Sequence, residues 1–361
     1  KNRGLGCVLI RESECESHSI QLGLIYKLNE RRIVAGIEGG GTASKGLLVD
    51  ASNGKEVGRG EFGGTNYYLE GVQKAGDILA AWLRREKQKY GIVGPLTAVG
   101  MGLSGAEDEK INSQMTSYLM SQHGDISSSF YLQSDAVATV AGCFKEGGAI
   151  VIAGTGSSTR LITKNGELKG VGGWGHAIGD GGSAYWIANR GIRLIFDVED
   201  GLEEGDIGVL RKVVFEYFQV EDKVSLLDLF YSKFEKSKVA AVTAQLAKYA
   251  DDPTIARLFY DGGHILGRQM RALARKIPNE DTEMLSNLSV LVVGSVFNSW
   301  TLLKKGFTDA FDMSTSNISK MTLYRSEVDA CLGAVTMGAR QVNIDIPLPS
   351  LSNDRLFDVV P

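Results

Sequence analysis

The chain is poor in the residues that build metal centres and disulfide frameworks. Its 361 residues include four cysteines and four histidines. The cysteines contain no Cys-x-x-Cys pair and the histidines are scattered, so no zinc or iron–sulfur pattern is present. A disulfide framework is not expected in so long a chain. Free thiols in a reducing cytoplasm are the simplest interpretation.

The chain also lacks a strong charge of one sign and a long apolar run. Lys and Arg number 39 against 43 Asp and Glu, which gives a net charge of −4. This balance argues against nucleic acid or an anionic membrane as the main partner. No apolar stretch is long enough to span a bilayer. The six prolines are few, whereas the 45 glycines gather at strand-to-turn junctions and indicate tight turns.

Two glycine-rich hairpins stand out in what remains. Residues 33–50 and residues 149–163 each read as an apolar strand, a Gly/Thr/Ser turn and a second apolar strand. Each hairpin then reaches an Asn-Gly dipeptide, Asn53-Gly54 or Asn165-Gly166, of the kind that closes a tight turn. The repeat of one pattern in two successive segments suggests a duplicated fold.

The two turns, Gly39-Gly40-Gly41-Thr42 and Gly154-Thr155-Gly156-Ser157-Ser158, are suited to phosphate. Glycine lets the backbone approach an oxygen-rich ligand, and turn N–H groups and hydroxyls donate to it. The alternative for each turn is a plain hairpin turn. Phosphate binding is favoured over this alternative only because two such turns occur in matching places. No Gly-Lys-Ser/Thr follows, so neither turn is a P-loop. Each runs into a strand rather than a helix, which excludes a dinucleotide fingerprint.

Alternation of strands and helices predicts two mixed α/β lobes with a ligand cleft between them, the second lobe richer in helices. The predicted parts are an extension at 1–32, a first lobe at 33–145, a second lobe at 146–345 and a tail at 346–361. The last helix, at about 329–341, is rich in Ala and Gly and could pack back on the first lobe. We expect strands at 34–37, 45–50, 56–62, 97–103, 130–133, 149–152, 158–163, 167–171, 288–293 and, as an edge strand, 321–324. We expect the main helices at 71–90, 136–144, 183–197, 207–218, 226–234, 238–249, 253–275 and 295–311.

Several polar residues occupy positions suited to catalysis or ligand binding. Asp135 follows a strand and precedes a helix, so it could take a proton from an attacking hydroxyl or, with equal weight, cap the helix. Glu38 suits a magnesium shell. Asn66 could bind a vicinal diol or an amide, or simply form a turn. Gly294-Ser295, at the end of a strand, could receive a base or ribose or make a tight turn.

A glycine-rich run at 172–183 suggests a backbone shaped around a ligand. Within it, Asp180 could accept hydrogen bonds from hydroxyls, and Trp174 could stack on the apolar face of a sugar. The alternative for Trp174 is an anchor that fixes the loop to the core. We expect His176 to be structural.

The chain resembles the N-acetylglucosamine kinases of the BadF/BadG ATPase group, in the sugar-kinase/heat-shock-70/actin superfamily. The resemblance covers about residues 33–340, and its most specific runs are Gly172-Gly-Trp-Gly-His176 and Gly182-Ser-Ala-Tyr-Trp-Ile-Ala188. It is also carried by Glu38-Gly-Gly-Gly-Thr42, Thr65-Asn66, Leu103-Ser-Gly105, Asp135-Ala136, Gly154-Thr-Gly-Ser157, Gly179-Asp180, Tyr217-Phe-Gln-Val220, Val293-Gly-Ser-Val296 and Leu332-Gly-Ala-Val-Thr-Met-Gly-Ala-Arg340.

The resemblance implies two actin-like (ribonuclease H-like) lobes that close on a sugar and ATP–Mg²⁺, and a homodimer. The implied reaction is phosphorylation of N-acetyl-D-glucosamine at its 6-hydroxyl, with Asp135 as general base and Glu38 at the metal. The sugar contacts implied are Asn66, Ser104, Asp135, Ser157, Ser158, Gly173, Trp174, Gly175 and Asp180. The ATP contacts expected are Gly40, Gly41, Thr42, Thr155, Gly156, Ala240, Gly294 and Ser295.

The chain departs from the family pattern at two positions of the predicted sugar pocket. Gly181 stands where Glu is expected and Ser158 where Asn is expected. Glucosamine, N-acetylmannosamine and muramyl sugars therefore stay open as substrates, as does a non-catalytic sugar- or nucleotide-sensing module. The dehydratase activators of the same group bridge an iron–sulfur cluster with cysteines. No cysteine lies near a suitable glycine loop here, which counts against that function.

Overall fold

The computed structural model describes residues 32–164, 166–311, 317–325, 329–348 and 355–359. The extension predicted at 1–32 lies outside this part of the chain, apart from Arg32, and so does Asn165 of the second Asn-Gly turn. The described residues form two compact units. The first contains residues 32–142 and Asp329–Pro347, and the second contains the remainder. We assigned residues 329–345 to the second lobe's span but noted that the helix at about 329–341 could pack back on the first lobe, and this segment is grouped with the first unit.

The first unit is built on a five-stranded sheet. Its strands are β1 (Ile33–Gly39), β2 (Ala43–Asp50), β3 (Lys55–Gly63), β4 (Ala98–Leu103) and β5 (Phe130–Ser134), in the order β3-β2-β1-β4-β5. The first three strands pair antiparallel, whereas β4 lies parallel to both β1 and β5. The Asn53-Gly54 turn between β2 and β3 has Gly54 at φ 70°, as a tight hairpin requires.

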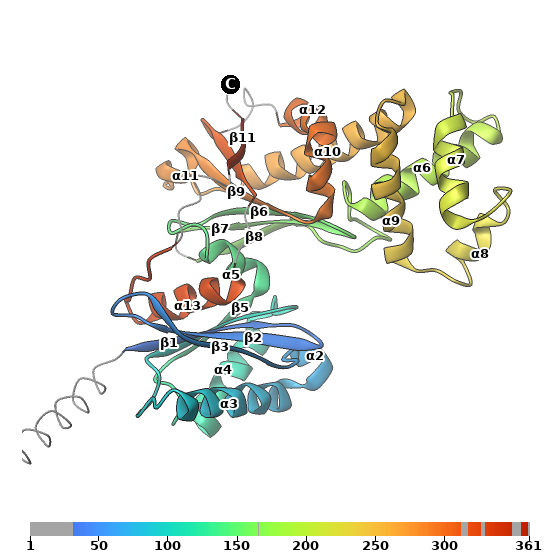
Figure 1. Ribbon diagram of the computed structural model, residues 1–361. Helices are drawn as coiled ribbons and strands as arrows, with labels where there is room; N and C mark the ends of the chain where they lie inside the picture. The colour runs from blue at the N-terminus through green and yellow to red at the C-terminus, as the bar shows by residue number, and fades with distance from the viewer. Residues whose placement is uncertain (1–31, 165, 312–316, 326–328, 349–354, 360–361) are drawn as a thin grey trace, which may run out of the picture. The chain divides into compact units, whose positions relative to one another are not determined.

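Helices cover both faces of this sheet (Figure 1). On one face lie α3 (Val72–Lys89) and α4 (Glu109–His123), and on the other α5 (Asp135–Ala141) and α13 (Ala330–Gln341). The short α2 (Tyr67–Glu70) precedes α3. The apolar face of α3 packs Leu79, Trp82 and Leu83 against the sheet because these positions recur at helical spacing.

The second unit repeats the topology of the first. Its strands are β6 (Gly148–Ala153), β7 (Ser157–Ile162), β8 (Leu168–Gly172), β9 (Leu288–Val293), β10 (Met321–Tyr324) and β11 (Arg355–Val359). Their order is β11-β10-β9-β6-β7-β8. The β6–β7–β8 hairpins are antiparallel, and β9 is parallel to β6 and β10, as β4 is to β1 and β5. The predicted duplication is therefore present.

Two predictions at the end of this sheet were wrong. We expected residues 321–324 to form an edge strand and residues 346–361 to be a tail. Instead, β10 lies inside the sheet because β11, from that tail, pairs antiparallel with its outer side.

The second unit is the richer in helices. They are α6 (Ala184–Glu199), α7 (Gly208–Phe218), α8 (Leu226–Phe230), α9 (Lys236–Leu246), η1 (Ala247–Tyr249), α10 (Pro253–Ala274), α11 (Thr282–Ser286), η2 (Ser295–Ser299) and α12 (Trp300–Ala310). The segment expected as one helix at 295–311 is thus a 3-10 turn followed by α12, and α8 is shorter than predicted. Across the described residues, no helix combines the length and the apolar character needed to cross a membrane.

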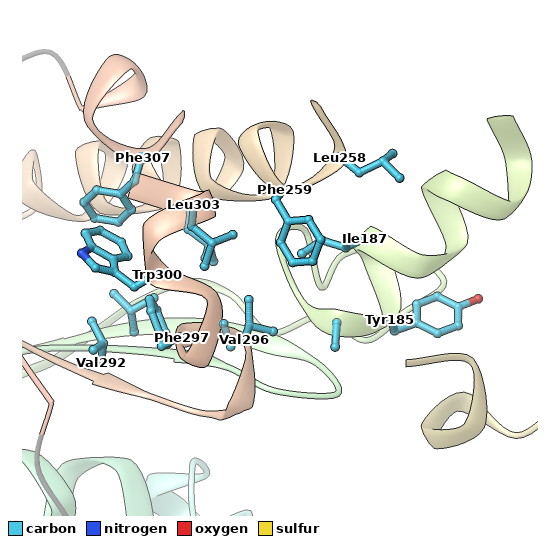
Figure 2. Packing of buried hydrophobic residues seen from close by; sticks show 14 of the residues in the cluster. Tyr185, Ile187, Leu258, Phe259, Val292, Val296, Phe297, Trp300, Leu303 and Phe307 are labelled. Carbon is cyan, nitrogen blue, oxygen red and sulfur yellow. The ribbon is translucent and has the colours of Figure 1, made fainter. Parts of the chain in front are cut away.

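Large apolar side chains from several of these elements meet in one core (Figure 2). Phe297 comes from η2, Trp300 and Phe307 from α12, and Phe259 from α10. The ring centroids of Trp300 and Phe307 are 5.4 Å apart. This core fixes η2 at the end of β9, where Ser295 is one of the predicted nucleotide-binding residues.

Candidate functional site

In the first unit, the turn between β1 and β2 is braced by the segment that follows β3. The Gly40 N–H donates to the Ala43 carbonyl at 3.0 Å, and the Thr65 N–H donates to the Gly40 carbonyl at 3.0 Å. A Cβ at Gly64 would lie 2.2 Å from the Gly41 carbonyl oxygen, so only glycine fits there. Gly41 and Thr42 remain exposed at the tip, where they can meet a ligand.

Asn66 and Ser104 lie against each other beside this turn. The Asn66 Nδ2 donates to the Ser104 carbonyl at 3.0 Å, and its Oδ1 accepts from the Tyr68 N–H at 2.9 Å. Asn66 is thus the N-cap of α2, as its turn alternative implied, and it keeps one amide hydrogen without a described partner. The Ser104 N–H donates to the Gly39 carbonyl at 2.8 Å, which ties both residues to the end of β1.

Asp135 stands at the same edge of the sheet. The register pairs Gly39 with Leu103 and Leu103 with Ser134 across parallel strands. The residues that follow these strand ends therefore gather at one edge. The Asp135 Oδ1 accepts from the Ala136 N–H at 2.7 Å, and no described residue contacts the other carboxylate oxygen by a hydrogen bond. The helix N-cap is Ser134 rather than Asp135, so one Asp135 oxygen is available to accept a proton.

Glu38 is the predicted metal ligand at the end of β1. Its side chain is half-buried and forms no hydrogen bond or ion pair with the described residues. Among those residues, no cluster of three His, Cys, Asp or Glu side chains is placed to hold an ion. A single free carboxylate fits Mg²⁺, which keeps waters and takes its other oxygens from substrate phosphates.

In the second unit, three residues predicted to bind the nucleotide line one cavity. Thr155, Ala240 and Ser295 belong to the β6–β7 turn, to α9 and to η2. The cavity has a volume of about 460 Å³, and its other lining residues are Ala184, Ser237, Ala241, Thr243, Ala244, Ala247, Val296, Asn298 and Ser299. Nearly all of these side chains are small, which leaves room for a flat base or a ribose.

Parallel pairing explains why this cavity forms. Ile152 of β6 pairs with Val293 of β9, so the chain leaves both strands at neighbouring points. Gly294, at φ 109°, follows β9, and a Cβ there would lie 2.3 Å from the Ala153 carbonyl oxygen. Glycine thus allows β9 to end against β6. The Gly154 carbonyl accepts from the Ala184 N–H at 2.8 Å and joins the turn to α6.

Asp180 lies beneath the Gly154–Gly156 turn and is buried. Its Oδ1 accepts from the Ser157 N–H at 3.3 Å, and its Oδ2 accepts from the Lys236 Nζ at 2.7 Å. The Ser157 hydroxyl donates to the Gly181 carbonyl at 2.8 Å. Sequence reasoning missed Lys236, although it stands one helical turn before Ala240.

The glycine run after β8 holds Trp174 outside the core. The Trp174 side chain is 74% exposed, so it is not the core anchor that we considered as an alternative. Gly173 and Gly175, on either side of Trp174, have φ of 84° and 78°. A Cβ at Gly173 would lie 3.1 Å from the Ser158 Cβ, which places these two predicted sugar contacts side by side. His176 packs against the Phe234 ring at 5.2 Å.

Two named enzymes and two solved structures are similar to the chain. It is 25% identical over 245 residues to an N-acetylmuramic acid/N-acetylglucosamine kinase of Clostridium acetobutylicum, a match covering 66% of this chain and 76% of that enzyme. It is 28% identical over 214 residues to an N-acetyl-D-glucosamine kinase of Dictyostelium discoideum, covering 56% of this chain and 65% of that enzyme. A provisionally named N-acetylglucosamine kinase from Chromobacterium violaceum superposes with a TM-score of 0.54 at 22% identity, over 84% of this chain and 98% of that one. The ROK hexokinase of Thermus thermophilus gives 0.50 at 15% identity, over 86% and 99%.

These two structures establish that both units have the actin-like sugar-kinase fold expected from the sequence. The β1–β2 and β6–β7 hairpins stand at corresponding places of the two sheets. The model of the BadF/BadG/BcrA/BcrD ATPase family matches residues 35–338, and these include both glycine turns, Asp135 and the cavity beside Thr155. The chain is therefore a member of the BadF/BadG/BcrA/BcrD ATPase family.

Proposed function

We propose that the protein is an ATP-dependent kinase that phosphorylates N-acetyl-D-glucosamine at the 6-hydroxyl. The observation that carries the nucleotide part is the cavity shared by Thr155, Ala240 and Ser295, next to a glycine turn. The sugar part rests on the two similar enzymes, since N-acetylglucosamine kinase occurs in both of their names. The absence of a disulfide or metal-binding pattern among the four cysteines supports a cytoplasmic location, and the resemblance supports a homodimer.

In this proposal the first unit supplies the base. The sugar 6-hydroxyl donates its proton to the free carboxylate oxygen of Asp135 while its oxygen attacks the terminal phosphorus of ATP. A bond forms between the sugar oxygen and phosphorus, the bond to the bridging oxygen breaks, and ADP leaves. Asn66 and Ser104, at the same edge of the sheet, orient the sugar hydroxyls.

In this proposal, hydrogen-bond donors bind the phosphate chain of ATP. Backbone N–H groups of the two glycine turns, with the hydroxyls of Thr42 and Thr155, donate to phosphate oxygens. Ala240 and Ser295 leave space for the nucleoside because their side chains are small. Mg²⁺, when bound at Glu38, would neutralise negative charge on the phosphates.

The second unit supplies further sugar contacts. Ser157 and Asp180 are joined by a hydrogen bond, and Ser158 lies beside Gly173. Trp174 is exposed and can stack on the apolar face of a pyranose ring. These residues would recognise the hydroxyl and N-acyl groups of the acceptor.

A second acceptor is favoured by one observation. The Clostridium acetobutylicum relative is named for N-acetylmuramic acid as well as N-acetylglucosamine. A muramyl sugar differs by a lactyl carboxylate, which needs room in the same pocket. Glucosamine and N-acetylmannosamine are further alternatives, and a non-catalytic sensing module would bind ligands without turnover.

The testing experiment is a measurement of ADP release from ATP–Mg²⁺ with purified protein. The acceptors are glucose, glucosamine, N-acetylglucosamine, N-acetylmannosamine and N-acetylmuramic acid. The proposal predicts clear preference for N-acetylglucosamine and a 6-phosphate product by NMR. Turnover with only one of the other sugars would change the assigned substrate but keep the kinase activity. ATP binding without turnover on any acceptor would favour the sensing module.

The role of Asp135 is tested by Asp135→Asn. An amide cannot take the hydroxyl proton, and loss of a positioned base lowers a rate by roughly 10²–10⁴-fold. We expect kcat to fall in this range while ATP binding, measured by calorimetry with a non-hydrolysable analogue, stays unchanged. The matched control is Asp108→Asn, at the exposed N-cap of α4. Near-normal turnover of the Asp135 variant would remove this residue from the role of base.

A further inference from the structure

Lys236 and Asp180 form an ion pair in the second unit, in which the carboxylate is buried and the ammonium is partly exposed. The Lys236 Nζ lies 2.7 Å from the Asp180 Oδ2, and the Asp180 side chain is 5% exposed against 30% for Lys236. The other carboxylate oxygen accepts the Ser157 N–H. Both oxygens of Asp180 therefore have partners within the protein, and Lys236 supplies the charge that balances this buried carboxylate.

The ion pair packs directly on the glycine turn between β6 and β7. A Cβ at Gly156 would lie 2.9 Å from the Asp180 Oδ2 and 3.1 Å from the Lys236 Nζ. Lys236 also begins α9, and Ser237 and Ala240 of the same helix line the cavity that Thr155 shares. One ammonium group thus touches the carboxylate assigned to the sugar and borders the turn assigned to ATP.

Stability alone does not explain a lysine at this place. A cation in the first turn of a helix is opposed by the positive end of the helix dipole. A buried ion pair is also often no more stabilising than apolar side chains of the same volume. Residues that break such local preferences tend to stand at functional sites, and this one has a predicted sugar contact on one side and a predicted phosphate turn on the other.

We propose that Lys236 is a positioning residue for the acceptor sugar, an inference that rests on the proposed kinase function. Its ammonium holds the Asp180 carboxylate in one orientation against the Gly154–Gly156 turn, ready to accept hydrogen bonds from sugar hydroxyls. The turn itself keeps two hydrogen bonds without Lys236, from the Gly154 N–H to the Gly156 carbonyl and from the Ala184 N–H to the Gly154 carbonyl. Sugar binding therefore depends on Lys236 more than ATP binding does.

The experiment compares Lys236→Met, Lys236→Arg and the control Lys238→Met in steady-state kinetics with both substrates. Truncating one partner of a buried charge pair is strongly unfavourable, so Lys236→Met should raise the sugar KM about tenfold or more. The KM for ATP should change by less than about threefold, because the turn keeps its own hydrogen bonds. Lys236→Arg keeps the charge and should recover most of the sugar affinity. Lys238, exposed on the same helix, should tolerate Met with wild-type constants.

The outcomes separate this inference from the proposed function. If the wild-type protein turns over and Lys236→Met keeps its sugar KM, or loses only thermal stability, the positioning role is overturned and the kinase function stands. If Lys236→Met does not fold, the charge-neutral Asp180→Asn/Lys236→Met variant replaces it. Its sugar KM should then match that of Asp180→Asn alone, and a further additive rise would overturn the inference. Absence of turnover by the wild-type protein on every acceptor would overturn both.

Discussion

Single buried polar residues shape the first unit's part of the site. The Tyr67 hydroxyl donates to the Asn112 Oδ1 at 3.0 Å and lies 3.3 Å from the Gly105 carbonyl. The Asn112 Nδ2 donates to the Ala106 carbonyl at 3.0 Å. Burial, followed by the charge of Tyr68, raises the pKa of Tyr67 to about 12. This neutral hydroxyl therefore stays a donor at physiological pH, and it holds the loop after Ser104 in place.

Replacing Tyr67 with Phe tests this hydrogen-bond network. The Asn112 Oδ1 would lose its donor inside the protein, and an unsatisfied buried acceptor lowers the free energy of unfolding by about 1–3 kcal/mol. Urea unfolding should show this loss. The control is Tyr231→Phe, because the Tyr231 side chain is 81% exposed. Equal stability of the two variants would contradict the role given to the Tyr67 hydroxyl.

At the scale of elements, α13 docks on the first unit by backbone contact. A Cβ at Gly333 would lie 1.7 Å from the Ala138 carbonyl oxygen, and one at Gly338 would lie 2.6 Å from the Gly100 nitrogen. The Ala- and Gly-rich composition that we noted in the sequence serves this close approach. The helix can lie over β1, β4 and α5 because these positions carry no side chain.

Gly333→Ala tests this close packing, because helix propensity and overpacking would change the stability in opposite directions. In an unconstrained helix, Ala is more favourable than Gly by about 1 kcal/mol. At this contact the added methyl group must displace backbone, and overpacking typically lowers stability by about 1–3 kcal/mol. We expect a lower melting temperature by calorimetry. Gln341→Ala, at the exposed end of α13, should leave it unchanged. A gain in stability at position 333 would show that α13 is not packed this closely.

At the scale of the whole molecule, the two units share a topology but carry different parts of the proposed chemistry. The first holds Asp135 and Glu38, and the second holds the cavity beside Thr155 and the Asp180–Lys236 pair. The second unit has in addition β11 and most of the helices. The homodimer implied by the resemblance stays a prediction.

This division predicts where a nucleotide protects the backbone from hydrogen exchange. With saturating non-hydrolysable ATP analogue and Mg²⁺, exchange should slow in the Gly154–Gly156 turn, the first half of α9 and η2. A ligand at about 100 times its Kd stabilises its bound state by about 2.7 kcal/mol, which mass spectrometry detects. Peptides from α3 should exchange as before. Protection of α3 without protection of η2 would exclude the cavity as the nucleotide site.

Local patterns in the sequence were enough for the hairpins, the duplication and the position of Asp135 at a strand end. They depend on residue alternation, turn dipeptides and helical spacing within a few residues. The resemblance added Ala240 to the predicted nucleotide-binding residues Thr155 and Ser295, and the structure brings these three into one cavity. The Ala- and Gly-rich composition of the last helix already suggested that it packs on the first unit. The contacts that only the tertiary structure decided join distant residues: Asp180 with Lys236, and β10 with β11. No local periodicity encodes such pairs, because they form only when the folded chain closes long loops and buries one surface against another.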